Sequence, residues 1–266
     1  MTEPILIADP DDPRIAPYRA IRERDLAGRQ GRFVAEGQVV LEKAIRLGRR
    51  RLESVLLAQG RVAGLRPLLA ELPEDTPIYT AAQAVMDAVV GFPIHRGVLA
   101  VGRRAPEPDP EQLLAGLGPQ ASVLGLVGIA NHDNMGGLFR NAAAFGVGAV
   151  VLDAACCDPL YRKAIRTSVG ASLIVPFARL APGGDMLALF EAAGFAPLAL
   201  SPGAAETLSA VGPAARTAVL VGAEGPGLPS EMLQRARAVS IPMAGGFDSL
   251  NVATAAAIVL HHLARA

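Results

Sequence analysis

Short apolar runs alternate with helical patterns through the second half of the chain, and this alternation limits the fold more than any other feature. The run SVLGLVGI at 122–129 contains no charged residue, as expected for a strand that is covered on both faces. Strands of this kind between helical segments are typical of an α/β domain with a parallel sheet. We expect strands at 122–129, 149–153, 172–177, 196–200, 217–222 and 239–243, and helices at 135–145, 163–168, 186–193 and 250–264.

The first half shows a second, smaller alternation of strands and helices. Residues 33–48 read as the end of a strand, a turn, and a helix with Val40, Ala44 and Leu47 along one face. Further strands are expected at 52–58, 77–81 and 95–103, and helices at 17–28 and 67–71.

A proline-rich segment separates the two halves. In RRAPEPDPEQ, Pro106, Pro108 and Pro110 stand among charged residues, so the segment suits a linker better than a regular element. We therefore predict a small N-terminal α/β domain over residues 1–104, a linker over 105–119 and a larger α/β domain over 120–266.

Composition excludes several classes of protein. Hydrophobic residues make up 51% of the 266 residues, yet no run reaches the roughly 18 uncharged residues that a membrane span needs. The acidic start MTEPILIADPDDPR lacks the pattern of a signal peptide, so a cytoplasmic location without membrane contact is expected. The histidines at 95, 132, 261 and 262 have no metal-ligand spacing, and no metal site is expected.

The chain has only two cysteines, and they are adjacent. Cys156 and Cys157 cannot join distant segments or complete a metal cluster. They read as small core residues of a reduced protein, with redox chemistry as the alternative.

Positive charge gathers near the N-terminus although the net charge is zero. Residues 14–51 contain eleven basic side chains against four acidic ones. Such an excess suits a phosphate-facing surface, because guanidinium groups bind phosphate through two hydrogen bonds. A solvated face in a chain that uses arginine more than lysine explains the count equally well.

The first segment that could carry chemistry is NHDNMGGLFRNAAAFG at 131–146. Asn134 is a candidate N-cap of a helix, and Gly136 and Gly137 would let a backbone or a ligand approach closely. Arg140 lies within two turns of the helix start, which is a setting for anions. Taken alone, an ordinary surface arginine is the simpler interpretation.

Two further segments place polar residues after apolar strands. In TAVLVGAEGPGL (217–228), Glu224 lies in a glycine-rich turn at the carboxyl end of a strand, where open parallel sheets bind ligands. In SIPMAGGFDSLNVATAAAIVLHHL (240–263), Ser249 is the expected N-cap, and Asn251 opens a helix that is apolar on nearly every side and should be buried.

Together the three segments resemble the motifs of the SpoU/TrmH family of RNA ribose methyltransferases, within the SPOUT superfamily. The first motif is met by Asn134, Gly136, Arg140 and Ala142, the second by Gly222, Glu224, Gly225, Gly227 and Leu228, and the third by Ile241, Pro242, Met243, Gly245, Ser249, Leu250, Asn251 and Val252. The segment KAIRTSVGA (163–171) is similar to the family's lysine, arginine and serine segment. Ala253 departs from the pattern, because members often carry a second serine there.

The resemblance is strong over 120–266 and weak over 30–104. It implies a trefoil-knotted SPOUT methyltransferase domain with a parallel sheet, a ribosomal-protein-like RNA-binding domain before it, and a homodimer formed through the knotted domain. It implies S-adenosylmethionine as methyl donor and a ribose 2′-hydroxyl of structured RNA as acceptor, with ribosomal RNA expected before transfer RNA.

The resemblance also assigns roles to residues. Because a guanidinium stays protonated in proteins, we expect Arg140 to stabilise negative charge and hold phosphate rather than to remove a proton. The expected catalytic residues are Arg140, Asn134, Glu224, Ser249 and Asn251; the expected donor-binding residues are Gly222, Ile241, Leu250, Met243, Ala223, Gly227 and Leu200; and the expected RNA-binding residues are Arg22, Arg24, Arg29, Arg32, Lys163, Arg166 and Ser168.

Three alternatives stay open at this stage. A Rossmann nucleotide enzyme is disfavoured, because GVGAVV at 146–151 precedes a strand and lacks the third glycine of the GxGxxG fingerprint. A catalytically inactive RNA-binding protein with the same fold is the main rival. Methyl transfer to a base nitrogen is a lesser one.

Overall fold

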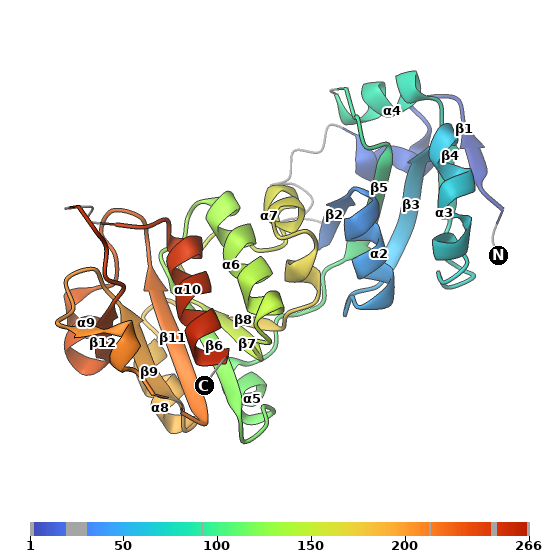
Figure 1. Ribbon diagram of the computed structural model, residues 1–266. Helices are drawn as coiled ribbons and strands as arrows, with labels where there is room; N and C mark the ends of the chain where they lie inside the picture. Colours follow the sequence, from blue (N-terminus) through green and yellow to red (C-terminus); the bar gives the residue numbers. More distant parts are fainter. Residues whose placement is uncertain (1–2, 20–30, 92, 213, 246–248, 265–266) are drawn as a thin grey trace. The chain divides into compact units, whose positions relative to one another are not determined.

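A computed structural model describes residues 3–19, 31–91, 93–212, 214–245 and 249–264 (Figure 1). The chain divides into two compact units, and each is treated by itself. The first unit comprises Met1–Pro106 with Leu160–Ile174, and the second comprises Glu107–Pro159 with Val175–Ala266. Most of the helix expected at 17–28 lies outside the described residues. None of the described helices is long and apolar enough to cross a membrane.

The second unit is built on a seven-stranded sheet in which every pair of neighbouring strands is parallel. The order is β10-β12-β9-β11-β6-β7-β8, so β11 lies in the middle beside β6 and β9. The predicted parallel α/β sheet is confirmed. Its strands are β6 (Ala121–Val127), β7 (Ala149–Leu152), β8 (Phe177–Arg179), β9 (Ala196–Leu200), β10 (Glu206–Thr207), β11 (Arg216–Gly222) and β12 (Arg237–Ser240).

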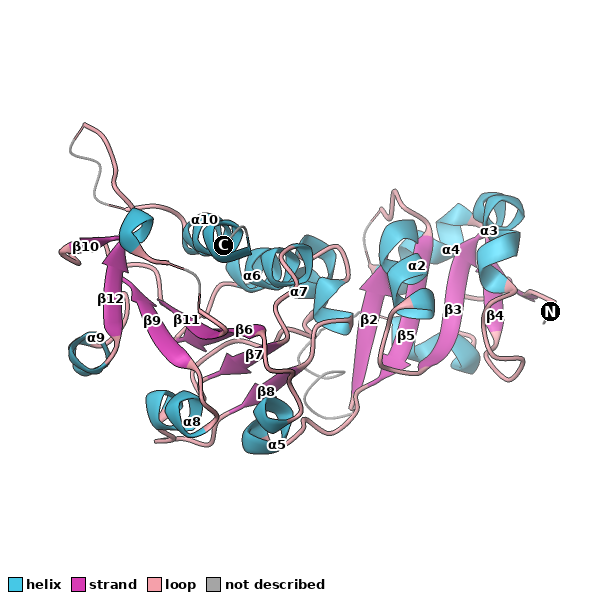
Figure 2. Ribbon diagram, turned by 60° about the horizontal axis from the view of Figure 1, so that its bottom comes forward, coloured by secondary structure: helices cyan, strands magenta, loops and turns pink. Residues whose placement is uncertain are grey.

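Helices cover both faces of this sheet, which explains why its central strands are apolar along most of their length. Figure 2 shows α6 and α10 on one face and α5 and α8 on the other. Gly125 in β6 makes room for α8, because a Cβ there would lie 2.8 Å from the sulfur of Met186 and 2.9 Å from the ring of Phe190. The helices are α5 (Pro110–Ala115), α6 (His132–Ala144), α8 (Met186–Ala192), α9 (Ser230–Arg235) and α10 (Val252–Ala264).

The first unit has a mixed sheet in the order β1-β4-β3-β5-β2. Strand β5 runs antiparallel to both β2 and β3, whereas β1, β4 and β3 are parallel. The turn η1 (Pro13–Tyr18) and helix α4 (Gln83–Val90) pack on one face, and neither was expected from the sequence. The strands are β1 (Ile5–Ile7), β2 (Arg32–Glu36), β3 (Leu52–Ala58), β4 (Ile78–Ala81) and β5 (Val98–Arg103), and the other helices are α2 (Gln38–Arg46) and α3 (Val62–Leu69).

Residues 160–174 belong to the first unit although the chain on both sides of them belongs to the second. Helix α7 (Arg162–Thr167) packs on β2, and the Arg162 guanidinium donates to the Glu36 carboxylate at 3.2 Å. Glu36 is only 6% exposed, so the carboxylate of this ion pair is buried, while the Arg162 side chain is partly exposed. Val169, a β-branched residue, follows α7 with a φ of 53°, a conformation that costs backbone energy.

Several expected boundaries are wrong. Residues 171–173 form a 3₁₀ turn, η3 (Ala171–Leu173), and the strand expected at 172–177 begins only at Phe177. Leu47 is 59% exposed rather than part of the helix's buried face, because α2 ends at Arg46. The helix expected at 67–71 is α3, which begins earlier and contains Pro67.

Candidate functional site

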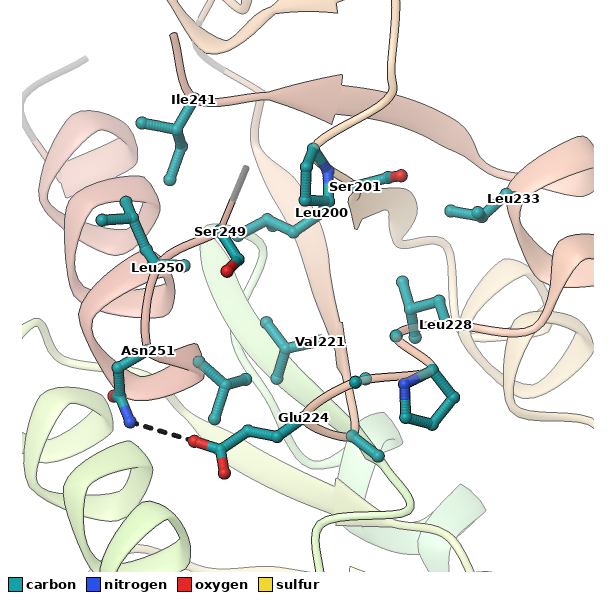
Figure 3. A pocket seen from close by; sticks show the side chains of 18 of the residues that line it. Leu200, Ser201, Val221, Glu224, Leu228, Leu233, Ile241, Ser249, Leu250 and Asn251 are labelled. Atoms are coloured by element: carbon teal, nitrogen blue, oxygen red, sulfur yellow. Dashed lines mark hydrogen bonds between the residues drawn. The ribbon is translucent and has the colours of Figure 1, made fainter. Parts of the chain in front are cut away.

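A cavity of about 490 Å³ lies where three neighbouring strands of the parallel sheet end. Leu200 ends β9 and Gly222 ends β11, while Ile241 directly follows β12, and all three line the cavity (Figure 3). The fourth wall is the segment from Ser249 to Ala255, which leads into α10. Carboxyl ends of parallel strands are the usual ligand sites of open α/β sheets.

The residues expected to bind a methyl donor gather in this cavity. Three of the expected catalytic residues, Glu224, Ser249 and Asn251, also line it. The donor-binding set that lines it is Leu200, Gly222, Ala223, Gly227, Ile241, Met243 and Leu250. All these residues therefore line one cavity. That they contact a methyl donor stays a prediction.

The turn after β11 is closed by its own backbone. The amide of Gly227 donates to the carbonyl of Ala223 at 3.0 Å, which folds the turn back on itself. A Cβ on Gly222 would lie 2.2 Å from the carbonyl carbon of Gly227 and 2.4 Å from the amide of Leu228. Because the obstructing atoms are backbone, position 222 has no room for a side chain.

The start of α6 differs from the expectation. Asn131, not Asn134, is the N-cap: its side-chain oxygen accepts from the amides of Asp133 at 2.8 Å and Asn134 at 3.3 Å. Asn134 lies inside the first turn and is 7% exposed. Its side chain is therefore available for a contact outside its own helix.

Asn251 makes that contact and joins the three motifs. Its side-chain nitrogen donates to Oδ1 of Asn134 at 2.8 Å and to Oε1 of Glu224 at 3.2 Å. Its side-chain oxygen accepts from the amides of Ala253 at 3.0 Å and Thr254 at 3.2 Å. The expected cap role of Ser249 is wrong, because Asn251 caps α10.

Close packing between α6 and α10 supports this arrangement. A Cβ on Gly137 would lie 2.8 Å from the Cβ of Ala253, and the Asn141 amide donates to the Ala253 carbonyl at 2.6 Å. Sequence reasoning missed Asn141, because an asparagine inside a helix carries no signal of a partner 112 residues away. The small side chain of Ala253 suits the close approach to Gly137.

Arg140 does not line the cavity of its own chain. It is exposed and lies in α6, six residues after Asn134, which is about 9 Å along the helix axis. The structure thus brings four of the five expected catalytic residues together and leaves Arg140 open to solvent.

A network of hydrogen bonds, which could not be predicted from the sequence, fixes the loop before α6. The Asp153 carboxylate accepts from the amide of Gly128 at 2.9 Å, and the Arg179 guanidinium donates to the carbonyls of Asp153 and Cys156. The Cys156 sulfur accepts from the amide of Ile129 at 3.3 Å. These contacts fix the chain that leads into Asn131.

Cys156 and Cys157 both take part in this hydrogen-bond network. Burial raises the pKa of the Cys156 thiol to about 12 and that of Cys157 to about 11. Both are therefore protonated at neutral pH, which argues against redox chemistry, since the thiolate is the reactive form. Among the described residues, no group of three His, Cys, Asp or Glu could hold a metal ion.

The expected RNA-binding residues have mixed placements. Arg22, Arg24 and Arg29 lie outside the described residues. Arg32 donates to the Glu53 carboxylate at 2.6 Å, whereas Lys163 and Arg166 are exposed on α7. Ser168 is fully buried and its hydroxyl donates to the Ile165 carbonyl at 3.0 Å, so the expectation that this hydroxyl contacts RNA does not suit its position.

Residues 121–261 match the SpoU rRNA Methylase family. The chain belongs to this family. It is 42% identical over 274 residues to an uncharacterized tRNA/rRNA methyltransferase of Mycobacterium bovis, covering 97% of this chain and 91% of the relative. It is 30% identical to another from Synechocystis, covering 97% and 93%. The predicted family is confirmed, and the SpoU chain is an RNA methyltransferase.

Solved structures agree with the SpoU fold. An AdoMet-bound rRNA methyltransferase from Sinorhizobium meliloti superposes with a TM-score of 0.82 at 22% identity, covering 98% of this chain and 97% of that one. An RNA 2′-O ribose methyltransferase superposes with a TM-score of 0.79 at 26% identity, covering 98% of both chains. The predicted α/β fold with a parallel sheet is confirmed, and the knot stays a prediction.

Proposed function

We propose that this SpoU protein transfers a methyl group from S-adenosylmethionine to a ribose 2′-hydroxyl in structured RNA, with ribosomal RNA ahead of transfer RNA as substrate. One observation carries the proposal: Asn251 connects Asn134 to Glu224 at the mouth of a cavity at the carboxyl edge of the sheet. Three motifs far apart in the sequence thereby meet at one site.

The cavity fits the proposed donor. Its volume of about 490 Å³ falls in the range of about 300–1,000 Å³ that is usual for small-molecule sites. Aliphatic side chains such as Leu200, Ile241 and Leu250 suit the faces of an adenine, and the glycine-rich turn after β11 presents backbone groups to the polar edges. When bound, the donor supplies a reactive methyl group on a positively charged sulfur.

The chain's own residues would position the acceptor and balance its charge. Asn251 donates to the Glu224 carboxylate, and Ser249 lines the same cavity. A ribose hydroxyl that loses its proton gains negative charge, and a guanidinium stabilises such charge and also holds phosphate. The residue proposed for this task is Arg140.

A second copy of the chain would supply the missing guanidinium. The described lining residues include no Arg or Lys, and Arg140 lies exposed on α6 of its own chain. Helix α10 also leaves Ile258 38% exposed, and an aliphatic side chain at that exposure suits burial against a partner. The proposal therefore includes a homodimer through a knotted second unit.

RNA would be held in addition by the first unit. Lys163 and Arg166 are exposed on α7, and Arg22, Arg24 and Arg29 complete the proposed set, whereas Arg32 pairs with Glu53. Arginine and lysine side chains bind the phosphate backbone regardless of sequence, so this surface would give affinity rather than site choice.

Arg140→Ala tests the proposal. Turnover on RNA from cells that lack the protein should fall by about 10²–10³-fold, the usual cost of losing one group that stabilises developing charge. Calorimetric donor affinity should change by less than about threefold. Arg235→Ala, which removes an exposed arginine of the same unit that pairs with Asp185, is the control.

Two outcomes would contradict the proposal in different ways. Near-normal turnover by Arg140→Ala removes Arg140 from the reaction. Donor binding by the wild-type protein, without methyl transfer to any ribose in a map of total RNA, would favour the inactive RNA-binding protein instead.

A further inference from the structure

One charged side chain, that of Glu224, is found among the described residues that line the cavity. The described residues that line it are apolar, glycine or proline residues, apart from two serines, Asn251 and Glu224. Glu224 is the one acidic residue among them, and none of them is Arg, Lys or His. A ligand that enters meets one carboxylate and no neutralising cation from this part of the chain.

The Glu224 carboxylate is held in place rather than free to turn away. Both lone-pair sites of the Asn251 side-chain oxygen serve the amides of Ala253 and Thr254, which fixes the orientation of the Asn251 amide. Its two N–H bonds then point to Asn134 and Glu224. Within the described residues Glu224 forms no salt bridge, so its charge is available to a ligand.

Glu224 itself lines the cavity, whose volume is about 490 Å³. Two charges closer together than about one Debye length, which is about 10 Å at 0.1 M salt, are only partly screened from one another. A positive charge of a ligand bound beside Glu224 is therefore attracted by this carboxylate.

Methyl transfer changes the charge of the ligand by one unit. The S–CH₃ bond breaks and an O–CH₃ bond forms, the bonding electron pair stays on sulfur, and the hydroxyl proton leaves to solvent. The sulfonium becomes a neutral thioether, whereas the amino and carboxyl groups of the ligand are unchanged. Donor and product thus differ at one positive charge and one methyl group.

We propose that Glu224 makes the cavity selective for the sulfonium donor over the thioether product, and so promotes product release. The attraction between the carboxylate and the sulfonium is present before transfer and absent after it. The inference rests on the proposed donor but not on the proposed ribose target.

Calorimetry on the full chain tests this selectivity. Dissociation constants for S-adenosylmethionine and S-adenosylhomocysteine are compared between wild type and Glu224→Gln, which keeps an oxygen acceptor for Asn251. We expect the variant to lose about tenfold in donor affinity, equivalent to about 1.4 kcal/mol, and less than twofold in product affinity. Glu191→Gln, which removes an exposed carboxylate from α8, should leave both constants unchanged.

Sinefungin and salt give two further measurements. Sinefungin carries an ammonium in place of the methyl sulfonium, so it should follow the donor and lose affinity in Glu224→Gln. The difference between donor and product should also shrink between 50 and 500 mM salt, because an exposed charge is screened.

The results separate this inference from the proposed function. If donor and product lose affinity equally in Glu224→Gln, or if neither changes, only the selectivity inference is overturned. If the wild-type protein binds neither ligand, the proposed methyl donor is wrong as well.

Discussion

The two units of this protein are both α/β, yet they differ in how their strands run. All seven strands of the second unit are parallel, so their carboxyl ends share one edge, and the cavity lies there. In the first unit β5 runs against both of its neighbours, so its loops alternate between edges. Uniform strand direction is what brings residues from distant motifs to one place.

Two carboxylates of the first unit also differ from the carboxylate at the cavity in their partners. In the first unit the buried Glu36 is neutralised by Arg162, and Glu53 accepts from both Arg32 and Arg103. At the cavity of the second unit, Glu224 has only the neutral Asn251 beside it among its described partners. Glu36 and Glu53 therefore hold structure together, whereas the role proposed for Glu224 is to act on a ligand.

Of these substitutions, Gly222→Ala should give the largest effect. It should disrupt the cavity of the second unit and leave the first unit intact. The added Cβ would overlap the backbone of Gly227 and Leu228, so the turn after β11 must open. We expect at least a hundredfold loss of donor affinity and a loss of about 3 kcal/mol in unfolding free energy. Gly203→Ala, where a Cβ meets nothing within 4 Å, is the control and should stay within about 0.5 kcal/mol of wild type.

Urea denaturation and donor calorimetry provide these two readings. Donor binding at wild-type strength by Gly222→Ala would mean that the turn does not shape the cavity.

Arg162→Met should affect the first unit and spare the cavity. It leaves the Glu36 carboxylate buried without its cation, which should cost about 2–3 kcal/mol, less than for a fully buried pair because Arg162 is partly exposed. Adding Glu36→Gln should restore part of the loss. Hydrogen exchange should locate the loosened amides in β2 and α7, while donor affinity stays unchanged.

If amide hydrogens in Arg162→Met exchange faster only in β11 and β12, the ion pair does not act mainly on the first unit.

Substitutions of Asn251 should give the smallest change in stability and separate its two roles. Asn251→Ala removes the cap of α10 and should cost about 1 kcal/mol. Asn251→Asp keeps an oxygen for the two amides but loses the N–H bonds to Asn134 and Glu224. Its melting temperature should stay close to wild type while turnover falls.

Equal turnover in wild type and Asn251→Asp would show that the contact with Glu224 has no part in the reaction.

The fold and the location of the site could largely be predicted from the sequence, but the caps could not. Continuous apolar runs marked the strands of the parallel sheet, and the three motifs marked the walls of the cavity. Asn131 and Asn134 are equally good caps by residue type, as are Ser249 and Asn251. Only the position where each helix begins decides which of them caps it.

The excess of positive charge near the N-terminus is partly offset in the structure by acidic residues that lie outside the counted segment. The count over 14–51 omitted carboxylates that come from outside that window. Five of its eleven basic residues pair with such carboxylates: Arg14 with Asp12, Arg19 with Asp11, Arg32 with Glu53, Arg46 with Glu71 and Arg51 with Asp75. A linear count of charge therefore overstates what is available to RNA.

The excursion of residues 160–174 has a consequence for synthesis on the ribosome. The chain changes unit after residues 106, 159 and 174, so neither unit is one continuous stretch. While the nascent chain ends before Leu160, β2 lacks α7 and Glu36 lacks its cation, and the apolar strands β6 and β7 have emerged without β9 and β11. The first unit therefore receives its last helix only after β6 and β7 of the second unit have been synthesised.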